Sequence, residues 1–349
     1  MDILNTTSRK RETYEVQLEY SLLWECALGI AAVTNSPLIK TLERPQEYWK
    51  QVKSSISDDL LDHLATVEEK NTWKSLLQLL HQEEFTEIKH FISYISELSE
   101  TDLKYICLPF IGQKYDEIRL RAAIGQHVAA TELMTLTKDN PFFPTYIEFI
   151  CDVNAAYLKE HLIAVMKGWF EQVIKNEKPE EVTTYLKTDL ESKIHMSKRM
   201  SPEALVEWAT GGIIYLPEPS IGRVLLIPQY VYRPWNIEAD IEGTKVFYYP
   251  IANESIFPNK PHIPNNFLVL RYKALGDEVR LRMIKLLYEN TLTLQDITNE
   301  LDIAKSTVHH HLKILRSARL VEIVNGVYCL KQNALKSLPK EMEQYLNPR

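Results

Sequence analysis

The chain has 349 residues, of which 45% are hydrophobic and 25% charged, as expected for a folded globular protein with about two domains. Its longest apolar stretch, residues 26–33, is far shorter than the roughly 18 residues that a membrane-spanning helix needs, and the N-terminus lacks a signal-peptide pattern. The four scattered cysteines form no CxxC motif, which favours a reducing compartment over a disulfide framework. We therefore expect a soluble cytoplasmic protein with no membrane partner.

The charge is distributed unevenly along the chain. The net charge is -7, but residues 271–349 contain 13 basic and 9 acidic residues, a net of +4, which leaves 27 basic and 38 acidic residues before them. A modest basic bias is weak evidence for nucleic-acid binding, because charged side chains usually only solvate a surface. The C-terminal part is nevertheless the place to look for such a function.

The N-terminal part is expected to be mainly helical. Alternating apolar residues at 14–20 predict a strand, and the apolar segment 22–33 predicts a helix. From residue 45 to about 208, apolar residues recur three and four positions apart, as in WKSLLQLLHQ and IKHFISYISEL. Ser201 and Pro202 mark the start of one more helix in this region.

Residues 213–250 have a different sequence pattern, in which glycine and proline separate runs of β-branched and aromatic residues. This pattern predicts a few strands. Within them, QYVYRPWN could line a ligand pocket, mark an interface, or supply aromatic strands to a core, and the last interpretation is favoured. The proline-rich stretch 258–264 is the expected domain boundary. The predicted fold class is mainly α, with an effector or dimerisation domain at 1–265, a winged helix-turn-helix at 266–335 and a tail at 336–349.

The pattern after residue 270 predicts a helix-turn-helix followed by a wing. Gly276 ends one helix and Asp277 caps the next. LTLQDITNEL predicts a short helix, and the turn at Asp302 and Ile303 precedes a longer helix. VEIV and VYCL flank Asn-Gly, the strongest short-range signal for a β-hairpin.

Three consecutive histidines, 309–311, occupy the longer helix. At about 100° per residue, Val308, Leu312 and Leu315 define a buried face, with His311 at its edge. His309 and His310 point outward and away from each other, so they are poor chelators, because a helix binds metal through ligands three or four residues apart. Imidazole and lysine donors on such a face suit guanine acceptors in the DNA major groove.

Less specific interpretations remain open at these positions. His311 could be a partly buried histidine that holds the helix in place. Lys305, Lys313 and Arg316 could form an ordinary solvated face. A winged helix can also serve as a protein-docking module.

The segments YKALGDEVRLRMIKLL and LQDITNELDIAKSTVHHHLKILRSARLVE resemble the winged-helix domain of the ArsR/SmtB family of bacterial transcriptional repressors, over about residues 268–330. The resemblance implies a homodimer bound to double-stranded DNA at a palindromic operator, with His311 as the family's histidine before leucine. With Lys313 added from the helical wheel, the predicted DNA-binding residues are Lys305, Ser306, Thr307, His309, His310, Lys313, Asn325 and Gly326.

The sequence departs from the family's metal sites. Thr293 and Gln295 occupy the positions of its Cys-x-Cys pair, and the C-terminal segment NALKSLPKEMEQYLNPR contains no histidine. HQEEF, at 81–85, lacks the second histidine of a zinc-protease motif, and there is no P-loop, GxSxG or GxGxxG sequence. We therefore expect no metal, no cofactor and no enzymatic activity.

The leading hypothesis is a transcriptional regulator, with repressor preferred over activator, whose N-terminal domain responds to a small-molecule effector or a partner. Two alternatives stay open: a winged helix that docks a protein, and an N-terminal enzyme fused to a DNA-binding domain.

Overall fold

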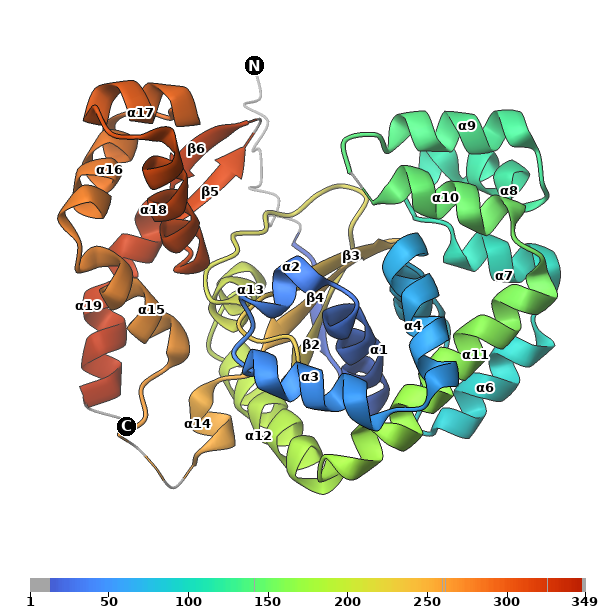
Figure 1. Ribbon diagram of the computed structural model, residues 1–349. Helices are drawn as coiled ribbons and strands as arrows, with labels where there is room; N and C mark the ends of the chain where they lie inside the picture. The colour runs from blue at the N-terminus through green and yellow to red at the C-terminus, as the bar shows by residue number, and fades with distance from the viewer. Residues whose placement is uncertain (1–12, 141, 259, 261, 325, 347–349) are drawn as a thin grey trace, which may run out of the picture. The chain divides into compact units, whose positions relative to one another are not determined.

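The computed structural model describes residues 13–140, 142–258, 260, 262–324 and 326–346 (Figure 1). The chain folds into two compact units. The N-terminal unit comprises residues 1–202 and 216–251, and the C-terminal unit comprises residues 203–215 and 252–349. Both are mainly helical, which confirms the predicted fold class.

The N-terminal unit combines one sheet with many helices. Its strands are β1 (Glu15–Leu18), β2 (Arg223–Gln229), β3 (Ile237–Ile241) and β4 (Thr244–Pro250). Its helices are α1 (Leu22–Val33), α2 (Ser36–Ile39), α3 (Gln46–Ser55), α4 (Asp58–Lys70), α5 (Trp73–Leu80), α6 (Ile88–Glu97), α7 (Glu100–Cys107), α8 (Asp116–Ala123), α9 (His127–Leu136), α10 (Phe143–Asp152), α11 (Ala155–Gln172) and α12 (Pro179–Ser197).

The sheet has the strand order β1-β2-β4-β3. β2 pairs in parallel with β1 and β4, and β3 pairs antiparallel with β4. The central strands β2 and β4 are buried along almost their whole length, as their continuous apolar sequences require, whereas β3 at the edge is exposed at alternate positions. The expected opening strand and helix are confirmed as β1 and α1.

Helix α1 is buried along nearly its whole length and packs against α5 and α11. It is apolar on every side, which is the pattern of a helix inside a core. Helix α12 contacts β1 and β2, whereas α8, α9 and α10 contact one another (Figure 1).

Apart from its first residue, Gln229, which ends β2, the aromatic stretch QYVYRPWN is a loop rather than a strand, because β3 begins at Ile237. Its side chains Val231, Tyr232 and Arg233 are nevertheless buried. The prediction that this stretch packs in a core was therefore correct, but the prediction that it forms strands was wrong.

The C-terminal unit contains the expected helix-turn-helix and wing. Its helices are α13 (Pro202–Thr210), α14 (Asn253–Ile256), α15 (Asn266–Leu275), α16 (Glu278–Glu289), α17 (Leu294–Leu301), α18 (Lys305–Ser317) and α19 (Gln332–Leu346), and its strands are β5 (Val321–Val324) and β6 (Val327–Leu330). Helix α19 covers residues 336–346 of the segment expected to be a tail, with Leu338 buried.

The loop that follows α13 is held in the C-terminal unit by cationic side chains. Arg271 Nη2 donates to the Gly211 carbonyl at 3.0 Å, and Lys331 Nζ donates to the carbonyl of Gly212. Gly211 has a φ of +68°, and a Cβ there would lie 2.5 Å from Arg319 Nη1. Glycine therefore permits both the backbone conformation and the close approach.

The proline-rich stretch lies within the C-terminal unit. Asn253 Nδ2 donates to the Pro264 carbonyl at 2.7 Å, and Tyr345 on α19 donates to the His262 carbonyl at 2.8 Å. Pro261 lies outside the described residues. The chain passes between the two units three times, after residues 202, 215 and 251.

Within the residues described, no helix is both long enough and apolar enough to cross a membrane.

Candidate nucleic-acid interface

Helices α17 and α18 form the helix-turn-helix. Thr293 caps α17 in a reciprocal capping box with Asp296, and Asp302 ends it in the left-handed conformation, with a φ of 52°. Because a left-handed residue breaks the helix sharply, α18 can begin three residues later at Lys305 and pack against α17 (Figure 1). The sequence predicted this turn correctly.

One face of α18 anchors it in the core of the C-terminal unit. Val308, Leu312 and Leu315 are at most 1% exposed. They belong to a hydrophobic cluster that includes Ile297 and Leu301 of α17. Ile314, which lies outside the face defined by Val308, Leu312 and Leu315, is partly buried against the same cluster. This packing fixes which residues of α18 face the solvent.

The opposite face of α18 exposes hydrogen-bond donors. The exposed residues include all those predicted from this helix: Lys305, Ser306, Thr307, His309, His310 and Lys313. Within the described part of the chain, none of these side chains has an intramolecular hydrogen bond or ion pair. The helix contains no acidic residue, so this face combines unpartnered donors with positive charge.

The first turn of α18 adds backbone donors to this face. Its N-cap residue, Ala304, provides no side-chain acceptor. The backbone N–H groups at the start of the helix therefore have no side-chain cap to satisfy them. Together with the helix dipole and Lys305, they make the first turn attractive to an anion such as a phosphate.

His311 has a different environment from its two neighbours. Its side chain is 14% exposed, and its Nδ1 atom lies 3.7 Å from Asp277 Oδ1 and 3.4 Å from Arg280 Nη1. Arg280 also donates to the carbonyl of Ala274 at 2.6 Å. His311 therefore contacts the junction of α15 and α16, as expected for a residue that positions the helix.

The wing is a two-stranded hairpin in which Val324 pairs with Val327. Gly326 is exposed in its turn, with a φ of +79°, whereas Asn325 lies outside the described residues. Tyr328 in β6 exchanges backbone hydrogen bonds with Leu292, which ties the hairpin to the segment before α17. The wing therefore belongs to the same folded unit as α18.

The two positions that match the family's Cys-x-Cys pair have structural roles here. Thr293 accepts a hydrogen bond from the Asp296 backbone at 3.2 Å, and Gln295 Nε2 donates to Asn299 Oδ1 at 3.0 Å. Among the described residues, no group of three or more His, Cys, Asp or Glu side chains could hold a metal ion.

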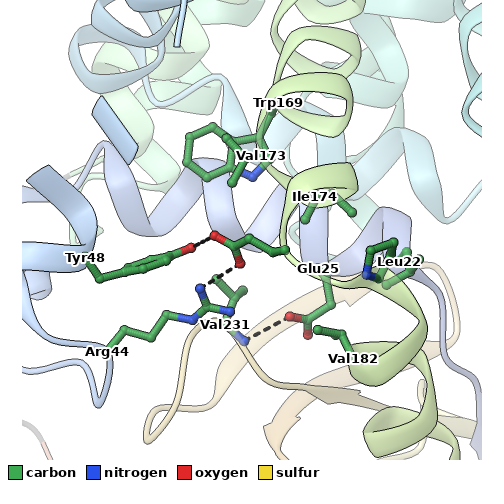
Figure 2. Close-up of a pocket in the computed structure, with 11 residues that line it drawn as sticks. Leu22, Glu25, Arg44, Tyr48, Trp169, Val173, Ile174, Val182 and Val231 are labelled. Carbon is green, nitrogen blue, oxygen red and sulfur yellow. Dashed lines mark hydrogen bonds and ion pairs between the residues drawn. The ribbon is translucent and has the colours of Figure 1, made fainter. Parts of the chain in front are cut away.

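Sequence reasoning did not find two further features of the structure. The contacts of Arg271 and Lys331 with the loop after α13 join segments far apart in the chain, and no local signal identifies them. The second feature is a small pocket in the N-terminal unit around Glu25 (Figure 2). Its sequence signals are a charged residue in an otherwise apolar helix and the stretch QYVYRPWN, for which the ligand-pocket interpretation was left open and whose Val231 lines this pocket.

Comparison with known proteins identifies the same segment. Residues 277–322 match the family model described as "Bacterial regulatory protein, arsR family". A curated relative, a "Transcriptional repressor SmtB homolog" from Synechocystis sp. (strain ATCC 27184 / PCC 6803 / Kazusa), is 34% identical over 79 residues, which are 22% of this chain and 60% of the relative. The chain thus spans less than two thirds of that relative's length, and no solved structure matches. The C-terminal unit contains an ArsR/SmtB-family helix-turn-helix domain, with a β-hairpin wing after it.

Proposed function

We propose that this protein is a sequence-specific regulator of transcription that binds double-stranded DNA as a homodimer, represses its targets in the cytoplasm and is controlled through its N-terminal unit. The N-terminal unit acts in this proposal as a sensor for an effector and not as an enzyme. The ArsR-family domain and the similarity to a transcriptional repressor homologue support the DNA-binding part.

The observation that carries the proposal is the exposed face of α18. A solvated surface usually mixes both signs of charge and pairs many of its donors. Here the face combines Lys305 and Lys313 with hydroxyl and imidazole side chains in between, and no carboxylate from the same helix opposes them. DNA offers the complementary surface, because phosphates and the major-groove edges of guanine accept hydrogen bonds.

The two kinds of side chain would have different tasks. Lys305 lies in the first turn with the uncapped N–H groups, which suits contact with a phosphate. His310 lies in the middle of the helix and is exposed, which suits contact with a base edge. The proposed dimer would present two α18 helices about 34 Å apart to successive major grooves of a palindromic site.

The proposal is tested by replacing one lysine on α18. Lys313→Ala should weaken binding to any DNA and reduce the slope of log affinity against log salt by about one, because one phosphate contact is lost. Fluorescence anisotropy across a salt series measures this slope. The matched control is Lys285→Ala on α16, which removes an exposed lysine paired with Glu289 at 2.6 Å and should leave the slope unchanged.

An unchanged slope for Lys313→Ala would remove this lysine from the interface. Absence of any DNA binding by the full chain would favour the protein-docking alternative.

A further inference from the structure

Helices α8 and α9 form a hairpin that exposes several apolar side chains. The two helices contact each other and are joined by the short loop at residues 124–126 (Figure 1). Leu120 and Ile124 are exposed at the end of α8, and Val128 and Leu136 are exposed on α9. Val128 is 81% exposed. Single exposed apolar residues are common on protein surfaces, whereas a contiguous group of them marks an interaction site.

An ion pair between the two helices shows that these side chains form one surface. Arg121 Nη2 on α8 lies 3.8 Å from Glu132 Oε2 on α9, so the outer faces of the helices meet at this pair. Residues three or four positions apart are neighbours on a helix. Ile124 therefore lies one turn beyond Arg121. Val128 and Leu136 lie one turn before and one turn after Glu132. We call this surface the α8–α9 face, and it consists of Leu120, Arg121, Ile124, Val128, Glu132 and Leu136.

The inner faces of the same helices are already packed. Ala122 and Ala123 of α8, and Ala129 and Leu133 of α9, are at most 2% exposed and belong to the main hydrophobic cluster of the N-terminal unit. Closely packed interiors have no room for additional side chains. The apolar side chains of the α8–α9 face therefore cannot turn inward, and only another molecule can remove them from water.

We propose that the α8–α9 face is the surface through which two copies of this chain form a homodimer. In this dimer the apolar side chains of the two faces pack together, and Arg121 of each copy pairs with Glu132 of the other. The inference deepens the proposed function and rests on it, because that function requires two α18 helices on one DNA site.

The charges of the α8–α9 face favour a second copy over other partners. In a twofold interface the same surface meets itself, and a contact from residue i to residue j is matched by one from j to i. A centre with one cation and one anion is its own complement in this arrangement. Arg121 and Glu132 thus each gain a second partner of opposite charge when the apolar residues around them are buried.

Other occupants fit this surface less well. A strongly acidic or strongly basic partner would match one of the two central charges and repel the other. An anionic membrane surface would meet Glu132 and the exposed Glu117. A wholly apolar partner would bury the ion pair without adding a charge to it, which is costly because both charges lose water.

The test measures the oligomeric state of the full chain without DNA. Sedimentation over a concentration series should show an equilibrium between monomer and dimer for the wild type. Val128→Asp should weaken dimerisation by about tenfold or more, because it buries an unpaired charge in the interface. The variant should fold normally, because residue 128 is exposed in the first turn of α9, where an acidic side chain is favourable.

Charge reversal tests the pairing between copies. Arg121→Glu and Glu132→Arg each place two like charges at the centre of the face, so each variant should dimerise about tenfold more weakly than the wild type or worse. When the two variants are mixed, they should form a heterodimer and recover most of the lost affinity, because an acidic centre then meets a basic one. Lys50→Glu reverses an exposed charge on α3 and, as the control, should not change dimerisation.

Three results would overturn the proposal: a monomeric wild type at every concentration, an undiminished dimer in Val128→Asp, or no association between the two charge-reversed variants. An undiminished dimer in Val128→Asp would leave the proposed DNA-binding function intact, with the dimer interface elsewhere. A wild-type dimer that loses its affinity through Val128→Asp but binds no DNA would support the α8–α9 face and contradict the proposed function.

Discussion

The solvent face of α18 and the pocket around Glu25 use charged and polar side chains in opposite ways. On α18, the donors of Lys305, His309 and Lys313 are exposed and have no intramolecular partner among the described residues. In the pocket, Glu25 is buried and Arg44 and Glu177 pair with each other. The first arrangement offers a surface to a large partner, whereas the second can only enclose something small.

Because of this difference, substitutions on the outer face of α18 should affect function, whereas substitutions of the buried charges should affect stability. Exposed polar groups contribute little to folding, so the outer face of α18 can be changed without loss of the fold. Buried charges change the free energy of unfolding when they are altered, because each has been removed from water. The two regions should therefore respond very differently to substitution and to pH.

The largest effect is a loss of stability, expected when a buried residue on the inner face of α18 is replaced. Leu312→Ala should lower the stability of the C-terminal unit by about 2–5 kcal/mol, because it leaves a cavity in a closely packed core. Hydrogen exchange of the α15–α19 amides measures the loss. His309→Ala, on the outer face of the same helix, is the control and should change stability by less than about 0.5 kcal/mol. Equal protection in both variants would contradict the two-faced packing.

The next effect is a pH dependence in the N-terminal unit. Because the pKa of Glu25 is raised to about 7, the folded state binds more protons than the unfolded state between about pH 4.5 and 7. This group should therefore lower the unfolding free energy by on the order of 3 kcal/mol as pH rises across that window. Urea denaturation of the wild type and Glu25→Gln at pH 5 and pH 7.5 measures the difference.

Two histidines, His161 in the core and the partly buried His81, change the unfolding free energy with pH in the opposite direction. Burial, the larger cause for both, lowers the pKa of His161 to about 4 and that of His81 to about 3. Their contribution is complete above the unfolded histidine pKa of about 6.5 and is lost as pH falls below it. The wild type and Glu25→Gln share both histidines, so the difference between them isolates Glu25. An equal pH dependence in the two proteins would contradict the assignment.

A smaller effect is expected at His310. If this residue contacts a base edge, His310→Ala should weaken binding to the cognate site by about 1–3 kcal/mol and affect random DNA much less. Anisotropy titrations on both DNAs at one salt concentration compare the losses. Equal loss on the two DNAs would assign His310 to the backbone instead.

The smallest effect is expected from removal of metal ions, which should not change DNA affinity. Thr293 and Gln295 are engaged in a cap and in a side-chain hydrogen bond, so the family's thiolate site is not available. We predict less than stoichiometric zinc after purification without chelator, and DNA affinity that EDTA leaves unchanged. Elemental analysis that found one tightly held metal per chain would refute this prediction.

The success of sequence reasoning differed between the two units for a physical reason. In the helix-turn-helix, the capping residue Asp277, the turn at Asp302 and the hairpin glycine are local signals, and each acts within a few residues. Their order along the chain was enough to predict the fold and the exposed face of α18.

The features that the sequence did not reveal depend on distant contacts. The loop after α13 belongs to the C-terminal unit because Arg271 and Lys331 bind its carbonyls, across 60 and 119 positions of sequence. The pocket unites Glu25 with backbone groups 205 and 206 positions away. Hydrophobic periodicity cannot report such pairings, because it describes one element at a time.

The proline-rich stretch 258–264 was expected to be the domain boundary, yet the chain passes between the units three times, after residues 202, 215 and 251. The loop after α13, which the sequence of the N-terminal unit flanks on both sides, is one more covalent route by which an effector could influence α18.

The central claim is that α18 binds specific double-stranded DNA. The most direct test is to incubate the full chain with fragmented genomic DNA and to sequence what it retains, in parallel with a variant that combines Lys305→Ala, His310→Ala and Lys313→Ala. We expect the wild type to enrich a small set of fragments that share a palindromic site, and the variant to lose this enrichment while remaining folded. Retention of no fragment above background, or equal enrichment by the folded variant, would contradict the claim.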